Sequence, residues 1–505
     1  MRPKSASKSL PSEALVLAAI VLPFLAWLTR FINLDFWYDE VFTLTNFVLV
    51  PLSKTFTDYS FPNNHVLFSL LSNLYLRVIG IPGPGPLLDR PWILRILPLC
   101  FSLGALVYVY LTGRRFLGRL QAQMSLAFLV TTIPFYNFAV QVRGFSLSLM
   151  LLSAMLYHAL CFEQNGRWLH ASVAGLTAAL SLYAIPLNLY FVAALGAWFL
   201  FSGFAPARGP SFSRRRLLLA GALGIGAGLS VLLYLPVLPD VVGNRFVRSH
   251  GLFNFETIRS TMPRVLYYFL SFRYLILALA ALGLVVLLSG RRRRGSASDR
   301  VLILLLVLLL GPFVLSFVRG DLPFLRVFVN LAPAFALLLA ALTARSIEPV
   351  PWLRNRSWLV VPLLVAYCNL TFWFGLNHIE SHVLTDIAEG RKSQDIFYNY
   401  YQAYYRPKAL VARLKEEVAR NPAPVVCLDY DQAALPEYLR LAGVDWNPPQ
   451  ALGPVLSQSD AAYAVTAFPD LFLNQMRTYF PQFTVTRLSR VPDFHNAFLL
   501  TRTPK

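Results

Sequence analysis

The chain has 505 residues, of which 56% are hydrophobic and only 14% are charged. Soluble domains carry about 25% charged residues, so this composition excludes an ordinary soluble protein and indicates a polytopic membrane protein. The formal charge of +20 belongs entirely to residues 1–376, because residues 377–505 carry equal numbers of basic and acidic side chains. The basic residues form short clusters between apolar runs, which is typical of the positive-inside rule and argues against nucleic-acid binding.

The first apolar run covers residues 14–34 and follows a short basic segment. It is longer than the apolar core of a signal peptide, and no small-residue cleavage site precedes Asp35. We therefore expect a retained membrane span with the N-terminus in the cytoplasm.

Two adjacent carboxylates, Asp39 and Glu40, follow this span. Ionised groups at the edge of hydrocarbon are costly and usually mark a functional site, and general base chemistry needs a partly desolvated carboxylate. Neighbouring residues point in different directions on a helix, so the two are not expected to face each other. The alternative is structural: both acids belong to the first turn of an amphipathic helix over residues 39–52, with Asp35 as its N-cap.

A second polar segment combines Asp58, Asn64 and His65, which are candidates for a substrate or acceptor loop. It precedes an apolar stretch, 65–81, that we interpret as an interfacial or re-entrant helix on the outer face; a short true span is the alternative. Two other interpretations of the polar residues stay open. Asn64 is an N-cap with His65 in the first helical turn, or Asp58 and His65 bind a metal together with Asp39.

We expect about eleven membrane spans, within a range of about 10–13. They cover residues 13–33, 92–113, 120–140, 143–163, 169–184, 186–202, 217–237, 264–289, 301–318, 327–345 and 357–376. Basic clusters at alternate loops place the first loop, residues 34–91, and the tail, residues 377–505, on the non-cytoplasmic side. The runs 169–184 and 186–202 are short enough to form one broken pair that does not fully cross.

Several basic residues lie in loops expected on the outer side, where the positive-inside rule disfavours them. They are Arg143, which follows Gln141 at the end of a span, Arg326 in a short turn, and Arg245 and His250 in a longer loop, where these two are further candidates for contact with the substrate or acceptor. Their number favours an anionic ligand, because the arginine fork matches a phosphate group. For any one of them, snorkelling at the membrane interface is the alternative explanation.

The tail has the composition of a small soluble α/β domain. Spacing and turn residues predict helices over 407–420 and 432–441 and strands over 425–429, 461–467 and 497–501. No glycine-rich phosphate loop indicates a nucleotide site, and the four cysteines show neither a disulfide framework nor metal spacing. We therefore expect a transmembrane catalytic domain over 1–376 and a soluble extracytoplasmic domain over 377–505.

An ordered set of motifs within residues 10–345 resembles the GT-C membrane glycosyltransferases. It is most similar to glycosyltransferase family 39, which is related to the protein O-mannosyltransferases and to the lipid A aminoarabinose transferase. Trp-Tyr-Asp-Glu-Val-Phe-Thr at 37–43 resembles the first-loop Asp-Glu motif of the family, and Asn-Asn-His-Val-Leu at 63–67 resembles its second motif. The other matching segments are 89–98, 113–118, Gln-Val-Arg-Gly-Phe at 141–145, and Leu-Arg-Val-Phe-Val at 325–329.

The resemblance implies a GT-C fold and transfer of a sugar from a polyprenyl-phosphate donor on the outer face of the membrane. The first-loop aspartate of the family is the catalytic base, which is Asp39 here. Glu40 and His65 would support it or hold a metal or the acceptor, which leaves a divalent cation open. Arg143 and Arg326 would hold the lipid phosphate.

Two departures from the family pattern concern the substrates. Phe145 replaces a tyrosine, which puts the donor in question, and Val66-Leu67 replaces the usual Pro-Pro, which puts the acceptor loop in question. The rival functions are a transporter or flippase for a lipid-linked substrate and a non-catalytic protein that binds envelope glycolipids. A transporter tends to show repeated halves and ionisable groups at the midplane. The expected spans of this chain are nearly free of acids, and we find no internal repeat. An acyl- or phosphotransferase would need a nucleophile or a membrane histidine, for which His158 is a weak candidate.

Overall fold

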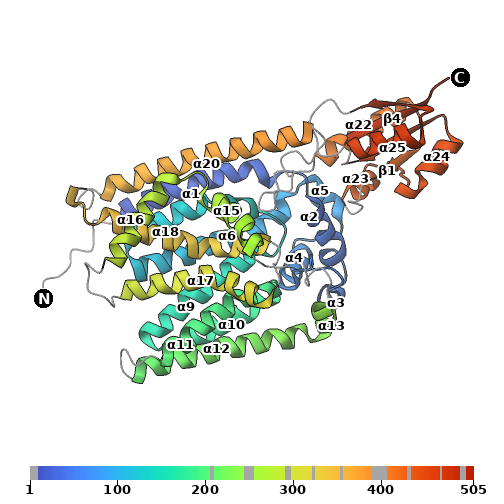
Figure 1. The fold of residues 1–505 in the computed structure, drawn as a ribbon. Helices are drawn as coiled ribbons and strands as arrows, with labels where there is room; N and C mark the ends of the chain where they lie inside the picture. Colours follow the sequence, from blue (N-terminus) through green and yellow to red (C-terminus); the bar gives the residue numbers. More distant parts are fainter. Residues whose placement is uncertain are drawn as a thin grey trace. The chain divides into compact units, whose positions relative to one another are not determined.

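A computed structural model describes residues 10–204, 210–243, 255–289, 297–320, 325–352, 357–388, 406–428, 434–466, 469–488 and 496–504 (Figure 1). The helices of the N-terminal three quarters are α1 (Leu10–Ile32), α2 (Tyr38–Thr43), α3 (Leu52–Thr57), α4 (Val66–Val78), α5 (Pro84–Asp89), α6 (Trp92–Thr112), α7 (Arg119–Val130), α8 (Ile133–Phe138), α9 (Phe145–Asn165), α10 (Trp168–Ala184), α11 (Leu189–Phe204), α12 (Pro210–Tyr234), α13 (Leu238–Gly243), α15 (Phe255–Leu270), α16 (Tyr274–Leu288), α17 (Ala297–Arg319), α18 (Ala332–Ile347) and α20 (Ser357–Ala388). The shorter 3-10 or π-helical turns among them are η1 (Leu44–Val48), η2 (Gly113–Leu117), η3 (Pro186–Asn188), η4 (Leu235–Val237) and η5 (Leu325–Leu331).

The described residues form two compact units. The first unit takes its residues from Met1–Thr29, Pro51–Leu74 and Arg95–Gly375, and the second from Arg30–Val50, Tyr75–Leu94 and Leu376–Lys505. The second unit therefore combines the C-terminal region with two parts of the segment between the first two expected spans.

Seven of the described helices are long and apolar enough to cross a membrane. They are Glu13–Ile32, Trp92–Leu117, Phe145–Asn165, Ser213–Gly243, Asp299–Arg319, Arg326–Ile347 and Leu359–His382. Each overlaps one of the expected spans, which confirms the polytopic helical class. The four remaining expected spans are also helical, but they are shorter or interrupted. The runs 169–184 and 186–202 are the separate helices α10 and α11, joined through η3.

Helix α4, the segment expected to lie at the interface or to re-enter, has 13 residues. At 1.5 Å per residue its length is about 20 Å, which is less than the roughly 30 Å of a hydrocarbon core. The length therefore agrees with a helix that does not span; its place at the outer face stays a prediction.

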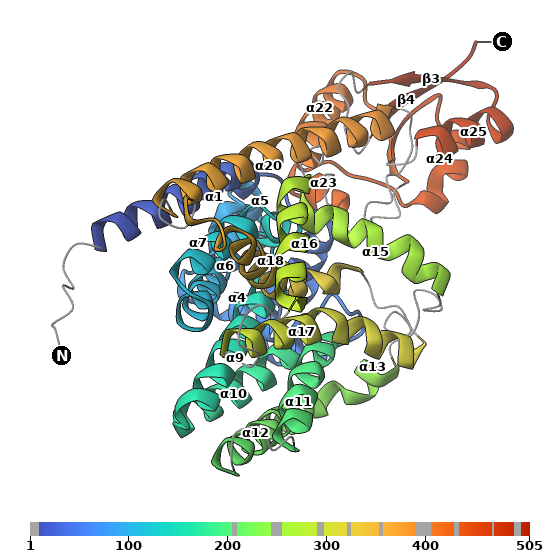
Figure 2. The same ribbon diagram turned by 60° about the vertical axis from the view of Figure 1, so that its left-hand side comes forward.

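Helices α9, α10, α11 and α12 pack together in the first unit (Figure 2), and α17 packs on α11. A Cβ atom at Gly226 of α12 would lie 2.2 Å from the carbonyl oxygen of Gly175 of α10, so the two backbones nearly touch. Small residues at such crossings let membrane helices associate through dense packing. Helices α7, α16 and α18 form a neighbouring group, which α17 joins to the first.

Two of the expected spans are broken in the middle. The span 120–140 is α7 and α8, separated at Thr131 and Thr132, and the span 264–289 is α15 and α16, separated at residues 271–273. Ser271 and Phe272 have φ angles of 45° and 64°, in the left-handed region that ends a right-handed helix and is unfavourable for residues other than glycine.

Arg273 is completely buried and joins the two breaks. Its guanidinium donates to the carbonyl oxygens of Leu270 (2.7 Å), Phe269 (2.9 Å), Phe128 (3.0 Å) and Thr131 (3.3 Å), and to the hydroxyls of Thr131 (3.2 Å) and Thr132 (3.3 Å). The last carbonyl groups of a helix have no partner within that helix, and burying them unpaired is costly. Arg273 therefore caps the C-terminal ends of α7 and α15 together.

The C-terminal region contains the expected α/β domain. Its elements are α22 (Pro407–Arg420), β1 (Val425–Cys427), α23 (Leu435–Leu441), η6 (Pro449–Ala451), α24 (Leu452–Gln458), β2 (Ala461–Thr466), α25 (Pro469–Tyr479), β3 (Phe483–Arg487) and β4 (Asn496–Arg502). The sheet has the order β1-β2-β4-β3, with β1 and β2 parallel and the other pairs antiparallel.

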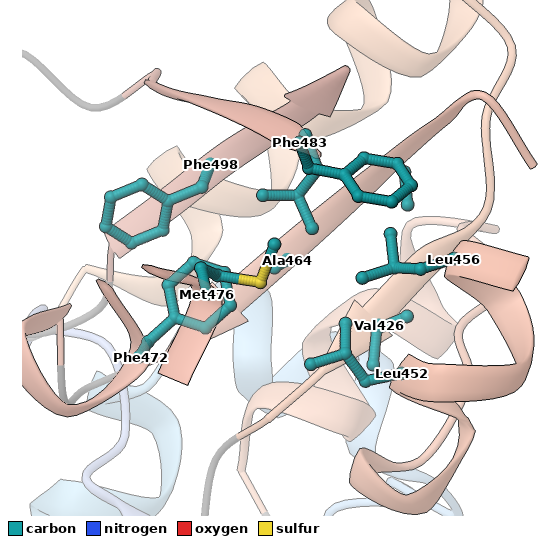
Figure 3. Close-up of a cluster of buried hydrophobic side chains, with 10 residues drawn as sticks. Val426, Leu452, Leu456, Ala464, Phe472, Met476, Phe483 and Phe498 are labelled. Atoms are coloured by element: carbon teal, nitrogen blue, oxygen red, sulfur yellow. The ribbon is translucent and has the colours of Figure 1, made fainter. Parts of the chain in front are cut away.

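The core of this domain lies between the sheet and the helices α24 and α25 (Figure 3). Phe472 of α25 packs on Phe498 of β4 with ring centroids 5.1 Å apart, and Met476 and Leu456 belong to the same buried cluster. Three strands and the helices α22 and α23 of the domain were expected, whereas α24, α25 and the edge strand β3 were not. In β3 only Phe483 at its start is buried, while its other residues are partly or fully exposed.

Candidate active site

Asp39 and Glu40 lie in the first turn of α2, and both are buried, with exposed fractions of 3% and 1%. The Glu40 carboxylate accepts a hydrogen bond from the backbone N–H of Trp37 at 2.9 Å, as the acid of a capping box does. Trp37, and not Asp35, is the N-cap residue. The structural interpretation of the acid pair therefore holds for Glu40, whose carboxylate closes the capping box.

The helix that carries Asp39 is shorter than the expected amphipathic helix over 39–52. After α2 it widens into the π-helical turn η1 and ends at Val48. The hydroxyl of Thr43 donates to the carbonyl oxygen of Asp39 at 2.8 Å, which supports the backbone where the helix changes its pitch. Single π-helical turns occur frequently at functional sites.

Arg143 and Gln141 lie in the turn between α8 and α9, and the second polar segment docks on this turn. The Arg143 guanidinium donates to the side-chain oxygen of Asn63 at 3.1 Å. The backbone N–H of Gly144 donates to Nδ1 of His65 at 2.7 Å. The structure thus brings together two motifs that are about eighty residues apart in the sequence.

Phe145 is a common platform for the two polar side chains. The Arg143 guanidinium carbon lies 5.4 Å from its ring centroid, a cation–π distance. The ring of His65 meets it edge to face, with centroids 5.2 Å apart. Phe138 packs on the same ring at 4.6 Å. None of these contacts uses the hydroxyl that a tyrosine would add at position 145.

The contact with Gly144 assigns the tautomer of neutral His65. Because Nδ1 accepts a hydrogen bond, the ring proton is on Nε2, which is therefore a donor. A histidine nitrogen binds a metal through a free lone pair, which protonated Nε2 lacks. Neutral His65 in this arrangement is thus suited to an anion or a carbonyl oxygen. Among the described residues no group of three or more His, Cys, Asp or Glu side chains is placed to hold a metal ion.

Gly144→Ala should disrupt this junction. A Cβ atom at position 144 would lie 2.7–2.9 Å from three atoms of His65, although the backbone there is ordinary for alanine. We expect a loss of about 1–3 kcal/mol in the free energy of unfolding, measured in detergent. Gly228→Ala is the matched control, because nothing lies within 4 Å of its added Cβ; an equal loss in both variants would contradict the tight fit at His65.

Asp58 and Asn64 form the loop between α3 and α4. Asp58 accepts from the backbone N–H and the hydroxyl of Ser60 at 3.0 and 2.7 Å. The side-chain amide of Asn64 donates to the carbonyl oxygens of Thr55 and Asp58 at 2.9 and 2.7 Å. Helix α4 begins at Val66, so the N-cap position falls to His65 and not to Asn64. A contact of Asp58 or Asn64 with substrate stays a prediction.

The neighbouring Tyr59 anchors this loop to the helices. It packs on Tyr234 with ring centroids 6.1 Å apart, and the hydroxyl of Tyr234 donates to the carbonyl oxygen of Tyr183 at 2.9 Å. Burial raises the pKa of the Tyr59 phenol, which therefore stays neutral and is no candidate for a base.

Arg326 lies in η5, which packs against α9 and η3. Asn330 of the same turn donates to the side-chain oxygen of Asn188 at 2.7 Å, and Asn188 donates to the hydroxyl of Ser148 at 2.6 Å. All three are buried. This polar chain ties the turn of Arg326 to the helix that follows Arg143. The two other expected cations, Arg245 and His250, lie outside the described residues.

Sequence reasoning missed Arg273, Asn188 and Asn330. The sequence did contain a signal for Arg273, because an arginine in the middle of an apolar run is costly to bury and needs hydrogen-bond partners. Asn188 follows the Ile-Pro pair that was recognised as a break, and polar groups commonly satisfy the backbone at such breaks. Asn330 has no local signal.

The sequence matches no family model, and no curated protein matches it. The structure is similar to that of ArnT from Cupriavidus metallidurans bound to undecaprenyl phosphate, with 13% identity, a TM-score of 0.51, and coverage of 97% of this chain and 99% of that chain. The apo state of that ArnT has 12% identity and a TM-score of 0.49, with coverage of 98% and 100%. The archaeal oligosaccharyltransferase AglB from Archaeoglobus fulgidus, in complex with an inhibitory peptide and a dolichol-phosphate, has 12% identity and a TM-score of 0.47, with coverage of 92% and 70%.

The likeness to undecaprenyl-phosphate-bound ArnT extends over nearly the whole of both chains. At this low identity it establishes the architecture and not the activity. It agrees with the helical class and with the ordered motifs of the sequence. The chain is a multi-pass membrane protein with the GT-C fold.

Proposed function

We propose that this chain is an inverting glycosyltransferase, a hexosyl- or pentosyltransferase of class EC 2.4. It moves a sugar from a polyprenyl-phosphate donor to a hydroxyl group of a glycan, lipid or protein during glycan biosynthesis in the cell envelope. The GT-C fold supports this proposal, and the similar ArnT structure is bound to undecaprenyl phosphate.

The observation that carries the proposal is the set of buried hydrogen-bond donors at the turn between α8 and α9. The Arg143 guanidinium is held in this turn by Asn63, and neutral His65 carries its ring proton on Nε2. The side-chain nitrogen of Gln141 is buried and has no hydrogen-bond partner among the described residues. Donors from one turn and its docked loop suit a phosphate group, which accepts hydrogen bonds and carries negative charge. We assign Arg326 as a further ligand of the same phosphate. Its turn η5 is tied by hydrogen bonds to α9, the helix that follows Arg143.

We assign Asp39 as the base. It takes the proton of the acceptor hydroxyl as that oxygen attacks the anomeric carbon, and the bond from this carbon to the phosphate oxygen breaks. The phosphate leaves with the electron pair and needs charge stabilisation more than a proton, which the donors supply. A single displacement inverts the configuration at carbon.

The proposed topology follows the basic clusters. The N-terminus is cytoplasmic, residues 1–376 form the transmembrane catalytic domain of a cell-membrane protein, and residues 377–505 are extracytoplasmic. Nucleotide sugars are cytoplasmic, so an outer-face enzyme depends on a lipid carrier. A labelling experiment that placed residues 34–91 in the cytoplasm would contradict this scheme.

The direct test is to incubate the purified chain with a panel of polyprenyl-phosphate sugars and to measure release of free polyprenyl phosphate together with a glycosylated product. Release that needs both an acceptor and an intact Asp39 supports the proposal. Transport of the donor across a vesicle membrane without cleavage would instead favour a flippase.

Removing the phosphate contact should weaken carrier binding. Arg143→Ala is expected to reduce the affinity for undecaprenyl phosphate by about 1.5–3 kcal/mol, the contribution of a charge-assisted hydrogen bond. Titration of the purified variant in detergent measures the effect. Arg413→Ala, in α22 of the soluble domain, is the control. Equal affinities of Arg143→Ala and the wild type would show that Arg143 serves only as an interface anchor.

A further inference from the structure

The C-terminal domain holds the chain segment that leads into Asp39. Residues 35–37 have no regular secondary structure, so their backbone groups need partners from elsewhere. The buried N–H of Phe36 donates to the hydroxyl of Tyr438 at 2.9 Å. Tyr438 lies in α23 and is buried, while Phe36 is completely buried. A residue 402 positions along the chain thus satisfies a backbone donor three residues before Asp39.

Asp35 makes the second connection to the same domain. Its carboxylate accepts a hydrogen bond from the backbone N–H of Lys408 at 3.0 Å. Lys408 is in the first turn of α22, where backbone N–H groups have no partner in the helix and a negative charge is favourable. Asp35 was expected as a possible cap of its own helix; it caps α22 instead.

The side chain of Lys408 extends this connection. Its ammonium lies 3.6 Å from the Asp35 carboxylate and donates to the carbonyl oxygen of Asp89 at 3.1 Å. Asp89 is the last residue of α5. Lys408 thereby links both first-loop parts of the second unit to α22.

These contacts support the Asp39 segment from two directions. The C-terminal domain holds residues 35 and 36, and Glu40 holds the backbone of Trp37 within the segment itself. The start of α2, and with it the direction of Asp39, therefore depends on α22 and α23.

We infer that Tyr438 and the Asp35–Lys408 pair are positioning residues for Asp39, so that the C-terminal domain sets the rate of transfer. This inference rests on the proposed function. It gives the domain a role in turnover that neither a passive cover nor a separate binding module would have.

The test compares Tyr438→Phe with Tyr479→Phe in the full-length protein. The first variant loses only the hydroxyl that accepts from Phe36; the second loses a hydroxyl from α25 whose residue is 71% exposed. Hydrogen exchange of the amides of residues 36–44 should become about tenfold faster in Tyr438→Phe and unchanged in Tyr479→Phe. Transfer by Tyr438→Phe should show kcat reduced by about tenfold or more, with KM for the donor within about twofold of the wild type.

A second pair of variants separates positioning from folding. Asp35→Asn keeps an oxygen that accepts from the N–H of Lys408, whereas Asp35→Ala does not. We expect Asp35→Asn to recover most of the kcat that Asp35→Ala loses. Binding of undecaprenyl phosphate should stay unchanged in all four variants.

Exchange needs no substrate, so it tests the contact independently of the proposed function. Unchanged exchange in Tyr438→Phe overturns the inference. Faster exchange with unchanged kcat also overturns it, while transfer that still depends on Asp39 leaves the proposed function intact. If the wild type transfers no sugar, the proposed function fails and the positioning of Asp39 for transfer fails with it.

Discussion

Asp39→Asn should abolish sugar transfer while the protein folds and binds undecaprenyl phosphate as before. Asparagine has nearly the same shape as aspartate, but its amide cannot take the proton of the acceptor hydroxyl. General base catalysis contributes about 10²–10⁴-fold to rates, so a loss of this size in kcat is expected. The measurement is the turnover of whichever polyprenyl-phosphate sugar the wild type uses as donor. The unfolding transition and the binding of undecaprenyl phosphate are recorded on the same preparation.

Glu40→Gln is the matched control for Asp39→Asn. Glutamine keeps a side-chain oxygen that can accept from the N–H of Trp37, so the start of α2 is preserved. If capping is the main role of Glu40, its variant should lose far less activity than Asp39→Asn. Equal losses in the two variants would show that both carboxylates take part in the chemistry, and near-normal turnover by Asp39→Asn would refute the assigned base.

Arg273→Ala should be severely destabilising. Four carbonyl groups and two hydroxyls lose their shared donor in a fully buried place. Each buried polar group left unsatisfied costs about 1–3 kcal/mol, so a loss of at least about 4 kcal/mol in the free energy of unfolding is expected. The opposing effect is relief from burying a charge, which can make an apolar replacement neutral or stabilising. We expect the unpaired carbonyls to dominate, because no apolar side chain can satisfy them.

Three variants at Arg273 separate these effects. Arg273→Met removes the charge but keeps much of the volume, and Arg273→Lys keeps the charge but loses the planar fork that reaches both helix breaks. All should be less stable than Arg420→Ala, which removes an arginine with 67% side-chain exposure from α22 and should change stability by less than about 0.5 kcal/mol. An Arg273→Met protein at least as stable as the wild type would show that charge burial outweighs the capping.

The long elements could be predicted from the sequence, because apolar runs and helical spacing are local properties. The helix expected over 407–420 is α22 with the same bounds, and the seven long apolar helices all fall on expected spans. Strands β1, β2 and β4 are buried runs bounded by turn residues and were expected close to their observed positions. The resemblance also led to the GT-C fold, which the comparison with ArnT confirmed.

The breaks and the long-range contacts could not be predicted in this way. Neither Thr131-Thr132 nor Ser271-Phe272 contains the proline or glycine that usually marks a helix end. The left-handed backbone at residues 271 and 272 is stable because Arg273 holds the surrounding carbonyls, which is a tertiary effect.

For the candidate site, the resemblance named Asp39, Arg143 and His65 but not how they are held. The hydrogen bond from Gly144 to His65 joins residues 79 positions apart, and the support of Phe36 comes from near the other end of the chain. Local sequence patterns cannot predict contacts between residues so far apart in the chain. The capping role of Glu40 could be predicted from the local sequence, since an acid three residues after the N-cap residue is the usual arrangement of a capping box.

Because Arg273 caps two helices, it also constrains the order in which the helices can be inserted into the membrane and folded. Arg273 is synthesised 141 residues after Thr132. During that interval the end of α7 has polar backbone groups but lacks its eventual donor, and the hydrocarbon offers no water to replace it. The end of α7 should therefore stay near water or the insertion machinery until the break between α15 and α16, with Arg273, has been synthesised. Nascent chains that stop short of residue 273 would be the natural targets of membrane quality control.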